Sequence, residues 1–391
     1  MCGHRGGKND IGVDGMRIGI DLLWVRVGLC GGTESVIRNL MDGFLQYDTD
    51  NEYILFVAED NAESFEKYEE ESNGRMELCV CKVASSSQPR RILWENLHLD
   101  RLARSQRIGI MFIPVYSMPQ TWGSGIPYVC VIHDLQAIHY PQYFSLPRRL
   151  FLRYEWRHAC KKASRILTDS DFCRQDLARH YAGIQDRARL MYVPIPEQKY
   201  DWEQAGTALR PQIKALAGNE YYYCVSSLLP HKNLDTLLRT VERMRGQEVW
   251  GKRLLVISGV GGNQRQMEEK LEQYGITGQV VLTGFVSDME RDYLYEHCCL
   301  FLFPSIFEGF GMPPIEAMRR GKRVVMTRCS CLEEITRGRA VYVEDPYDPA
   351  QWQERIRAAE RMPEQREAFP EYEPENIVRQ YQRLWEEMAE S

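Results

Sequence analysis

The sequence predicts an α/β protein with two doubly wound, Rossmann-like parallel-sheet domains that face each other across a cleft. Three observations lead to this fold class. The chain has 391 residues, which exceeds the roughly 250 to 300 residues at which single hydrophobic cores stop growing. Apolar runs of strand length alternate with amphipathic runs of helix length, as in parallel sheets with crossover helices. This alternation occurs twice, on either side of a segment rich in proline and glycine.

The first predicted domain spans residues 16–195. It follows a polar, glycine-rich leader over residues 1–15, which lacks the apolar segment of a signal peptide. Helix-like segments separate most of the predicted strands. These strands are expected at residues 17–21, 53–58, 77–83, 109–114, 128–133 and 165–169.

The second predicted domain repeats the alternation over residues 219–372. Between the domains, residues 196–218 carry Pro196, Gly206 and Pro211 without a clear apolar period, which predicts a linker. Each strand of the second domain is followed by polar sequence of helical period. These strands are expected at residues 221–227, 253–259, 279–283, 300–304, 323–327 and 340–343.

Composition excludes several classes of protein. With 44% hydrophobic and 27% charged residues, the chain has the composition of a globular enzyme. A net charge of -6 argues against nucleic acid as a partner, because duplex binders concentrate lysine and arginine. No apolar run reaches the roughly 18 residues of a membrane-spanning helix. Twelve cysteines without an export signal predict free thiols and a cytoplasmic location.

The segment EGFGMPPIE, residues 308–316, is the strongest functional signal. It follows an apolar strand run, and its prolines can begin a helix because a proline in the first position loses no needed hydrogen bond. Free N–H groups at a helix start attract anions, and Gly309 and Gly311 let an anion approach the main chain. Glu308 and Glu316 can accept hydrogen bonds from hydroxyl groups. A nucleotide-diphosphate sugar requires this combination, whereas either glutamate alone also fits a helix-capping carboxylate on a solvated loop.

The longer segment PSIFEGFGMPPIEAMRRGKRVV closely resembles the signature of the retaining family 4 glycosyltransferases (glycosyl transferases group 1), which have the GT-B fold. The resemblance extends from the Gly-Gly loop near residue 31, through VIHD and SSLLPHKN, to the C-terminal helical stretch. Only the leader and the linker lie outside it. The resemblance implies an acceptor-side first domain, a second domain that binds the nucleotide sugar, and a helix over residues 373–391 that crosses back to the first domain.

The resemblance also assigns roles in the second domain. It implies that Glu308 contacts hydroxyls of the transferred sugar and that Glu316 binds the ribose. Lys232 would neutralise the departing diphosphate, although alone it also fits a surface lysine at a helix start. Ser227 replaces the arginine of the commonest family pattern, and His231 precedes the lysine, so one expected cation is missing or moved. The backbone amides implied to face the diphosphate are those of Gly309, Phe310, Gly311 and Met312.

Two further segments resemble the family in the first domain. Gly31 and Gly32 open a helix that Thr33 is expected to cap, and they resemble the glycine loop near the diphosphate and the acceptor. A Gly-Gly pair alone is most often a turn. His133 and Asp134 end an apolar run, where the family has a histidine beside the reacting sugar; they also fit a core histidine and a capping aspartate. The predicted catalytic residues are therefore His133, Asp134, Lys232 and Glu308.

Two glycine-containing segments complete the predicted donor site. GVGGNQ at Gly259 and GFVSD around Val286 follow strands of the second domain and resemble family segments near the base and the phosphates. Each is a weak signal by itself. The predicted donor-binding residues are Gly31, Gly32, Ser227, Lys232, Gly259, Val286, Glu308, Gly309, Phe310, Gly311, Met312 and Glu316.

No metal or other cofactor is expected, because the paired cysteines lack the spaced second pair of a zinc site. Basic residues instead recur every four positions at Arg149, Arg153, Arg157 and Lys161. Such a helix face fits an anionic membrane surface or a polyprenyl-phosphate-linked acceptor. It equally fits an ordinary solvated helix face.

Together these features predict a retaining glycosyltransferase that moves a hexosyl group from a nucleotide-diphosphate sugar, such as GDP-mannose or a UDP-hexose. The expected acceptor is a saccharide or a lipid-linked saccharide in bacterial cell-surface polysaccharide assembly. The resemblance favours same-face substitution without a protein nucleophile. Two alternatives remain: a non-catalytic sugar-nucleotide-binding protein and a nucleotide-sugar epimerase on the same fold. The expected location is the cytoplasm or the inner face of the cell membrane.

Overall fold

The structure, a computed structural model, describes residues 15–390 apart from 122, 124, 248–249 and 262–263. The chain divides into two compact units. Unit 1 comprises Met1–Pro196 with Pro370–Ser391, and unit 2 comprises Glu197–Phe369. The expected leader lies outside the described residues except for its last position. Within the described residues, no helix has the length and apolar character needed to span a membrane.

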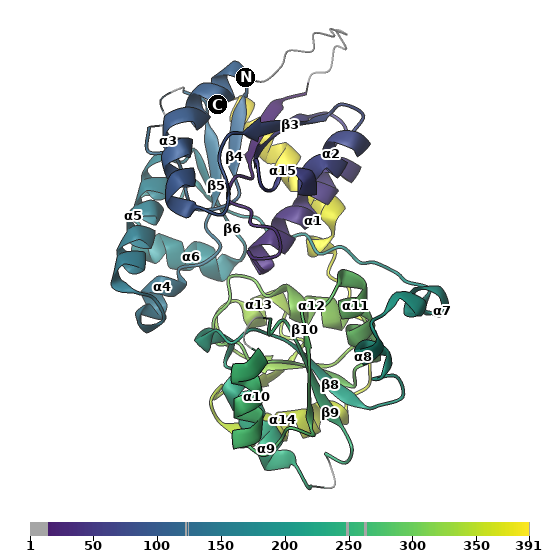
Figure 1. The fold of residues 1–391 in the computed structure, drawn as a ribbon. Helices are drawn as coiled ribbons and strands as arrows, with labels where there is room; N and C mark the ends of the chain where they lie inside the picture. Colours follow the sequence, from purple (N-terminus) through teal and green to yellow (C-terminus); the bar gives the residue numbers. More distant parts are fainter. Residues whose placement is uncertain (1–14, 122, 124, 248–249, 262–263, 391) are drawn as a thin grey trace. The chain divides into compact units, whose positions relative to one another are not determined.

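Unit 1 contains a seven-stranded parallel sheet in the order β3-β2-β1-β4-β5-β6-β7 (Figure 1). All six strands predicted for this domain are present. The seventh, β7, was not predicted, because its three residues carry too short an apolar pattern and depend on pairing with β6. The strands are β1 (Arg17–Asp21), β2 (Glu52–Ala58), β3 (Met76–Cys81), β4 (Ile110–Ile113), β5 (Tyr128–Val131), β6 (Arg165–Thr168) and β7 (Ala188–Leu190).

Helices cover both faces of this sheet, which explains why its strands are apolar almost throughout. One face packs against α1, α2 and α15, and the other against α3, α5 and α6. The helical elements are α1 (Gly32–Tyr47), η1 (Ala62–Phe65), α2 (Glu66–Glu71), α3 (Gln88–Ser105), α4 (Gln136–His139), η2 (Pro141–Tyr143), α5 (Leu146–Lys162), α6 (Asp171–His180), η5 (Pro370–Tyr372) and α15 (Pro374–Ala389).

The C-terminal helix α15 belongs to unit 1, although 173 residues of unit 2 precede it in the chain. Its buried side chains Val378, Tyr381 and Trp385 pack into the core beside α1. The two helices approach so closely that a Cβ atom on Gly43 would lie 3.0 Å from the Val378 side chain. Apolar burial therefore fixes the chain end to the first sheet.

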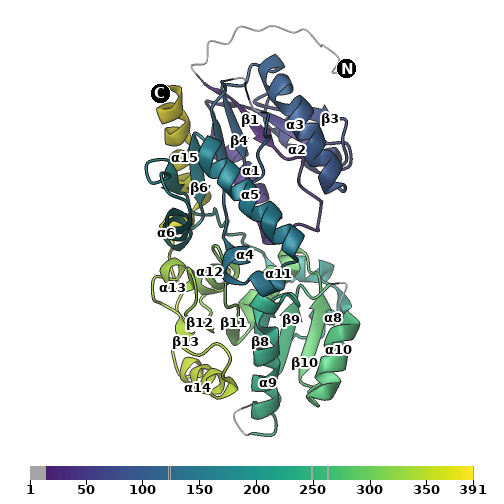
Figure 2. The same ribbon diagram turned by 90° about the vertical axis from the view of Figure 1, so that its left-hand side faces the viewer.

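Unit 2 contains a six-stranded parallel sheet in the order β10-β9-β8-β11-β12-β13 (Figure 2). All six strands predicted for the second domain are present. Its strands are β8 (Tyr221–Val225), β9 (Leu254–Ser258), β10 (Val280–Gly284), β11 (Leu300–Phe303), β12 (Val324–Thr327) and β13 (Val341–Val343). Its main helical elements are η4 (Pro230–Lys232), α9 (Leu234–Met244), α10 (Gln264–Gln273), α11 (Asp288–His297), α12 (Met312–Arg319), α13 (Leu332–Ile335) and α14 (Pro349–Glu360).

The segment expected as a linker, residues 196–218, carries three short helical elements and belongs almost entirely to unit 2. Arg210 forms an ion pair of 2.8 Å with the Glu290 carboxylate, and the Trp202 ring packs edge-on against Tyr293. These contacts, together with the buried side chains of Leu209, Ile213 and Leu216, hold the segment on unit 2. The elements are α7 (Trp202–Ala205), η3 (Gly206–Ala208) and α8 (Pro211–Lys214).

Candidate active site

Loops at one edge of the unit 2 sheet carry the predicted donor-binding residues other than Gly31 and Gly32. Ser227 follows β8, Gly259 follows β9, Val286 follows β10, and the 308–316 segment follows β11. In a parallel sheet the carboxyl ends of the strands share an edge. Strands β8 and β11 are neighbours at the centre, where the strand order reverses. Open α/β sheets bind their ligands at such a switch point.

The loop between β11 and α12 has a defined backbone conformation. Gly311 caps the helix at φ 99°, and a Cβ atom there would lie 3.0 Å from the Leu332 side chain, so glycine is required on both grounds. The Cys331 thiol donates to the carbonyl oxygens of Glu308 and Phe310. The loop therefore holds the start of α12 in a fixed position, with the backbone N–H groups of Gly311 and Met312 ahead of Pro313 and Pro314, which have none.

Lys232 and Glu308 form the central charged pair of this edge. The Lys232 ammonium lies 2.6 Å from the Glu308 carboxylate, with side chains only 24% and 14% exposed. The backbone supports the contact, because the N–H of Ile306 donates to the carbonyl oxygen of His231 at 2.8 Å. The structure thus brings together two residues that lie 76 positions apart in the chain.

Neither Ser227 nor His231 supplies the positive charge of the arginine that is common in the family pattern. Burial and the neighbouring Lys232 lower the pKa of His231 to about 4, so its ring is neutral near pH 7. Ser227 carries no charge, and its buried hydroxyl has no hydrogen-bond partner among the described residues. Lys232 is therefore the cation that this part of the edge offers a ligand, with the Ser227 hydroxyl as an unused neutral donor.

Glu316 is held by residues that the sequence did not indicate. The buried Tyr295 hydroxyl donates to its carboxylate at 2.7 Å, and the Arg291 guanidinium lies 3.8 Å away. Glu316 raises the pKa of Arg291 above its usual range. Both partners lie on α11, which packs against α12. No sequence motif contains them, so only the packing of these helices reveals the contact.

The loops after β9 and β10 approach each other closely. Gly259 has φ 91°, and a Cβ atom there would lie 2.6 Å from the carbonyl oxygen of Ser226. A Cβ atom on Gly261 would overlap the Phe285 ring. Phe285 is 66% exposed and precedes the half-buried Val286. The sequence did not single out Phe285, whose exposed ring offers a stacking surface beside the glycine loop.

In unit 1, His133 lies at the end of β5 with both ring nitrogens bonded. Nδ1 lies 2.7 Å from the Asp169 carboxylate and Nε2 lies 3.1 Å from the carbonyl oxygen of Pro114. Both partners are acceptors, so the protonated ring can donate to both of them and the neutral ring to one. Burial lowers the pKa of His133, but the Asp169 charge and these hydrogen bonds outweigh it and raise the pKa overall. The sequence did not indicate Asp169 as a partner.

Asp134 accepts a hydrogen bond of 2.8 Å from the backbone N–H of Gln136 and so holds the turn before α4, whose N-cap position is Leu135. This is the structural alternative that the sequence left open for it. Gly31, at φ 57°, precedes α1, and no side chain caps this helix. The expectation that Thr33 caps α1 is wrong, because Thr33 already lies inside the helix. Thr33 and His133 both line a cavity of about 20 Å³, so the residues that follow the glycine loop lie near the end of β5.

The predicted site residues thus form two groups. Gly31, Gly32, His133 and Asp134 belong to unit 1, and the remaining predicted residues belong to unit 2. Each group is defined within its own unit. Two family models match the chain in a corresponding way: Glycosyltransferase Family 4 matches residues 30–199, and Glycosyl transferases group 1 matches residues 207–376.

The chain belongs to the family 4 glycosyltransferases. This family 4 chain is 24% identical over 243 residues to the O-antigen chain mannosyltransferase RfbU of Salmonella typhimurium, covering 62% of the chain and 63% of the relative. It is 28% identical over 221 residues to O-antigen chain mannosyltransferase B of Escherichia coli, covering 56% and 58%. The chain therefore aligns with less than two thirds of either relative.

Solved structures show that this glycosyltransferase has the GT-B fold. Anabaena Alr3699/HepE in complex with UDP and glucose matches with a TM-score of 0.67 and 17% identity, covering 96% of this chain and all of the other. WaaG, a glycosyltransferase involved in lipopolysaccharide biosynthesis, matches with a TM-score of 0.62 and 16% identity, covering 95% and 98%. The predicted family and fold class are confirmed.

Proposed function

We propose that this family 4 glycosyltransferase moves a hexosyl group from a nucleotide-diphosphate sugar to an acceptor with retention of configuration, and that the first candidate sugar is mannose. The acceptor would be a saccharide or a polyprenyl-diphosphate-linked saccharide in cell-surface polysaccharide assembly. Two relatives that are O-antigen chain mannosyltransferases support the sugar and the process. The observation that carries the proposal is the pair of Lys232 and Glu308 at the switch point of the unit 2 sheet, beside the start of α12.

Each part of such a donor has a complementary group in unit 2. The Lys232 ammonium and the N–H groups at the start of α12 would bind the diphosphate. The carboxylates of Glu308 and Glu316 would accept hydrogen bonds from sugar and ribose hydroxyls. During transfer the bond from the anomeric carbon to the diphosphate breaks, and the acceptor oxygen bonds to the same face. The acceptor proton goes to the departing phosphate oxygen, so no protein nucleophile is required.

The roles of His133 and Asp134 stay predictions. His133 has both ring nitrogens engaged within unit 1, so its expected contribution is a fixed ring and a fixed backbone at the end of β5. Asp134 would act by holding the start of α4. If this is correct, His133→Ala lowers the transfer rate, while Asp134→Asn, which keeps an acceptor oxygen, has a smaller effect.

The test is a panel of nucleotides and nucleotide sugars, including GDP, UDP, GDP-mannose and UDP-glucose, scored by thermal stabilisation. A ligand at 100 times its Kd stabilises the native state by about 2.7 kcal/mol. Lys232→Ala and Glu316→Ala should reduce this stabilisation. Lys270→Ala is the matched control, because Lys270 forms a similar ion pair with Asp235 in unit 2, at 2.5 Å. If no nucleotide stabilises the wild type, the proposal is wrong.

Product analysis separates the alternatives. A transferase releases nucleotide in proportion to glycosylated acceptor, and the product keeps the anomeric configuration of the donor. An epimerase changes the sugar without an acceptor, and a non-catalytic binder shows stabilisation without turnover. We expect added magnesium to leave the transfer rate unchanged, since Lys232 and the backbone amides are assigned the neutralising role. A rate that requires magnesium would contradict this assignment.

We also propose that α5 contacts an anionic membrane surface where a lipid-linked acceptor resides. Arg153, Arg157 and Lys161 are exposed on this helix, whereas Arg149 is half-buried. Next to them run three exposed apolar side chains at a spacing of four, which the sequence pattern did not emphasise: Leu146, Leu150 and Tyr154. A basic row beside an exposed apolar row is typical of interfacial helices.

Vesicle co-sedimentation tests this contact. The wild type should sediment with vesicles that contain anionic phospholipid and not with purely zwitterionic vesicles. The double variant Arg153→Glu with Arg157→Glu should lose binding, whereas Arg265→Glu, on the exposed surface of unit 2, should keep it. Equal binding by both variants would assign the contact to another surface.

A further inference from the structure

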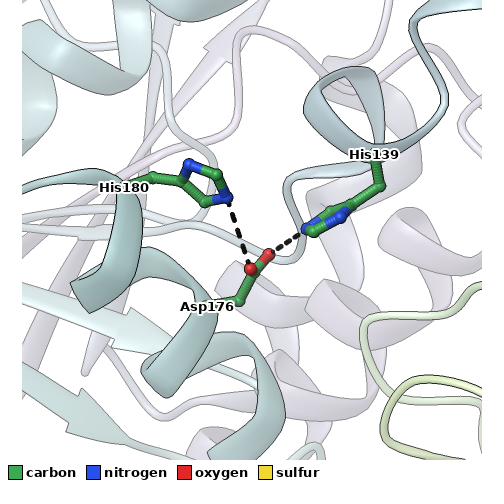
Figure 3. Close-up of side chains that lie close together, drawn as sticks. All are labelled: His139, Asp176 and His180. Carbon is green, nitrogen blue, oxygen red and sulfur yellow. Dashed lines mark hydrogen bonds and ion pairs between the residues drawn. The ribbon is translucent and has the colours of Figure 1, made fainter.

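Three potential metal ligands converge in unit 1, and none of them is among the predicted active-site residues. His139 Nε2 lies 2.7 Å from one carboxylate oxygen of Asp176, and His180 Nε2 lies 3.6 Å from the other. Figure 3 shows both rings turned with one nitrogen toward this carboxylate. The ligand atoms all lie within 4.8 Å of one another.

Helical spacing fixes two of the ligands. Asp176 and His180 are four residues apart on α6, so they share one face of the helix. The third ligand, His139, is the last residue of α4 and so comes from a different helix. The Asp176 side chain is only 4% exposed, whereas His139 and His180 are 34% and 36% exposed. A buried, oriented carboxylate thus sits beneath two accessible imidazoles.

We propose that His139, Asp176 and His180 form a binding site for Zn²⁺ or a similar divalent transition metal. Two imidazoles and one carboxylate suit zinc, cobalt, nickel and copper, whereas calcium and magnesium prefer sets made only of oxygen atoms. Three protein ligands leave a fourth tetrahedral position for water. The site is independent of the proposed transferase function.

The side chains must rotate to accept the ion, because a tetrahedral ion holds its ligand atoms closer together than the 4.8 Å within which they lie. Tetrahedral zinc with ligand bonds of about 2.0 to 2.1 Å places its ligand atoms about 3.3 Å apart. The 2.7 Å contact of His139 must widen slightly, and the 3.6 Å contact of His180 must shorten. Without metal, both nitrogens can donate protons to the carboxylate. With metal each Nε2 coordinates through its lone pair, so the hydrogen bonds to the carboxylate are replaced by bonds to the ion.

The neighbouring surface leaves room for the fourth ligand. His180 lines a surface pocket of about 470 Å³ together with Ile138, Arg153 and Arg157. The two arginines add positive charge nearby, which weakens cation binding but favours an anion in the open coordination position. The spacing of the cysteines predicted no metal site, whereas the proposed site in unit 1 uses no cysteine.

Metal binding would also have a structural consequence. Helix α4 has only four residues, and Asp134 accepts a hydrogen bond from the backbone N–H of its first residue. A metal ion bonded to His139 would fasten its other end to α6. The loop that follows His133 would then be fixed at both ends of α4.

Isothermal titration of Zn²⁺ into untagged, chelator-treated protein tests the site. We expect one ion per chain. His139→Ala and His180→Ala should each weaken the affinity by at least about tenfold. His98→Ala removes an exposed histidine of α3 outside the cluster and is the matched control.

Cobalt spectroscopy distinguishes this site from binding by thiols, since the chain has twelve cysteines. Co²⁺ in the proposed site should give visible bands of a nitrogen and oxygen environment without intense thiolate charge-transfer bands. Unfolding curves in chelator show that each variant is folded. Equal zinc affinity in wild type, His139→Ala and His180→Ala, or thiolate bands in the cobalt spectrum, would overturn the proposal.

Discussion

The hydrogen bond from Tyr295 to Glu316 predicts that Tyr295 positions the carboxylate proposed to bind ribose. Tyr295→Phe removes the hydroxyl, which lies 2.7 Å from the Glu316 carboxylate. The ring can stay in place, because it packs against Tyr223 and Phe301 with centroids 5.1 Å and 5.2 Å away. The substitution therefore tests the hydrogen bond without opening a cavity.

The magnitude follows from the charge and burial of the pair. A hydrogen bond to a charged group contributes about 1.5 to 3 kcal/mol, and the Glu316 side chain is only 13% exposed, so water replaces the lost donor poorly. We expect the free energy of unfolding to fall by about this amount. Freed from Tyr295, Glu316 would turn toward Arg291, and nucleotide affinity should fall by up to about tenfold, or about 1.4 kcal/mol.

Urea unfolding and calorimetric titration with GDP and UDP measure the two effects. Tyr274→Phe is the matched control, because the Tyr274 hydroxyl donates to the Asp235 carboxylate at 3.0 Å elsewhere in unit 2. The control should alter stability but not nucleotide affinity. Unchanged affinity in Tyr295→Phe, while Glu316→Ala binds weakly, refutes the positioning role. Unchanged affinity in both variants refutes the ribose role of Glu316 itself.

Three further outcomes are expected. Gly284 has φ 66° and open space around it, so Gly284→Ala should lower the free energy of unfolding by about 1 to 2 kcal/mol. Gly259→Ala should lower it clearly more, because the new Cβ atom also meets a carbonyl oxygen. Equal losses in urea unfolding would mean that the loop after β9 relaxes. Burial raises the pKa of Glu155 from 4.5 to about 7, so its stabilising contribution is complete below pH 4.5 and is lost as pH rises through 7; Glu155→Gln should flatten this part of the stability profile, and an unaltered profile would contradict it. Glu308→Gln should strengthen the binding of GDP or UDP because it releases Lys232, and it should slow the transfer reaction. Weaker nucleotide binding in a titration would show that Glu308 does not compete with the diphosphate for Lys232.

The fold was predictable because its main signals are local. Strands such as β11 and β8 are apolar throughout, and the helices between them are amphipathic, so alternation alone indicates parallel sheets covered on both faces. Strand β7 was missed because three residues carry no period and gain stability only by pairing with β6. The segment 196–218 was expected to be a linker because its prolines and glycines obscured a short apolar pattern, although Leu209, Ile213 and Leu216 are buried and Arg210 pairs with Glu290.

The site was predictable where one continuous motif carries it and not where packing completes it. The segment 308–316 supplies two carboxylates, glycines and a helix start within nine residues. Tyr295, Arg291 and Asp169 reach the predicted residues only through the packing of neighbouring elements. Likewise, His139 lies 37 positions before Asp176, so no spacing rule could have indicated the convergence seen in unit 1.

The ion pair of Lys232 and Glu308 changes what the donor motif implies about selectivity. From sequence, the lysine would serve the diphosphate and the glutamate the sugar, so that their substitutions would act separately. With 2.6 Å between them, a phosphate must compete with Glu308 for the ammonium, and a carboxylate released in this way becomes free to accept a sugar hydroxyl. Diphosphate binding would then prepare the site for the sugar. Since residues in direct contact do not contribute additively, the double substitution should differ from the sum of the single ones in donor affinity.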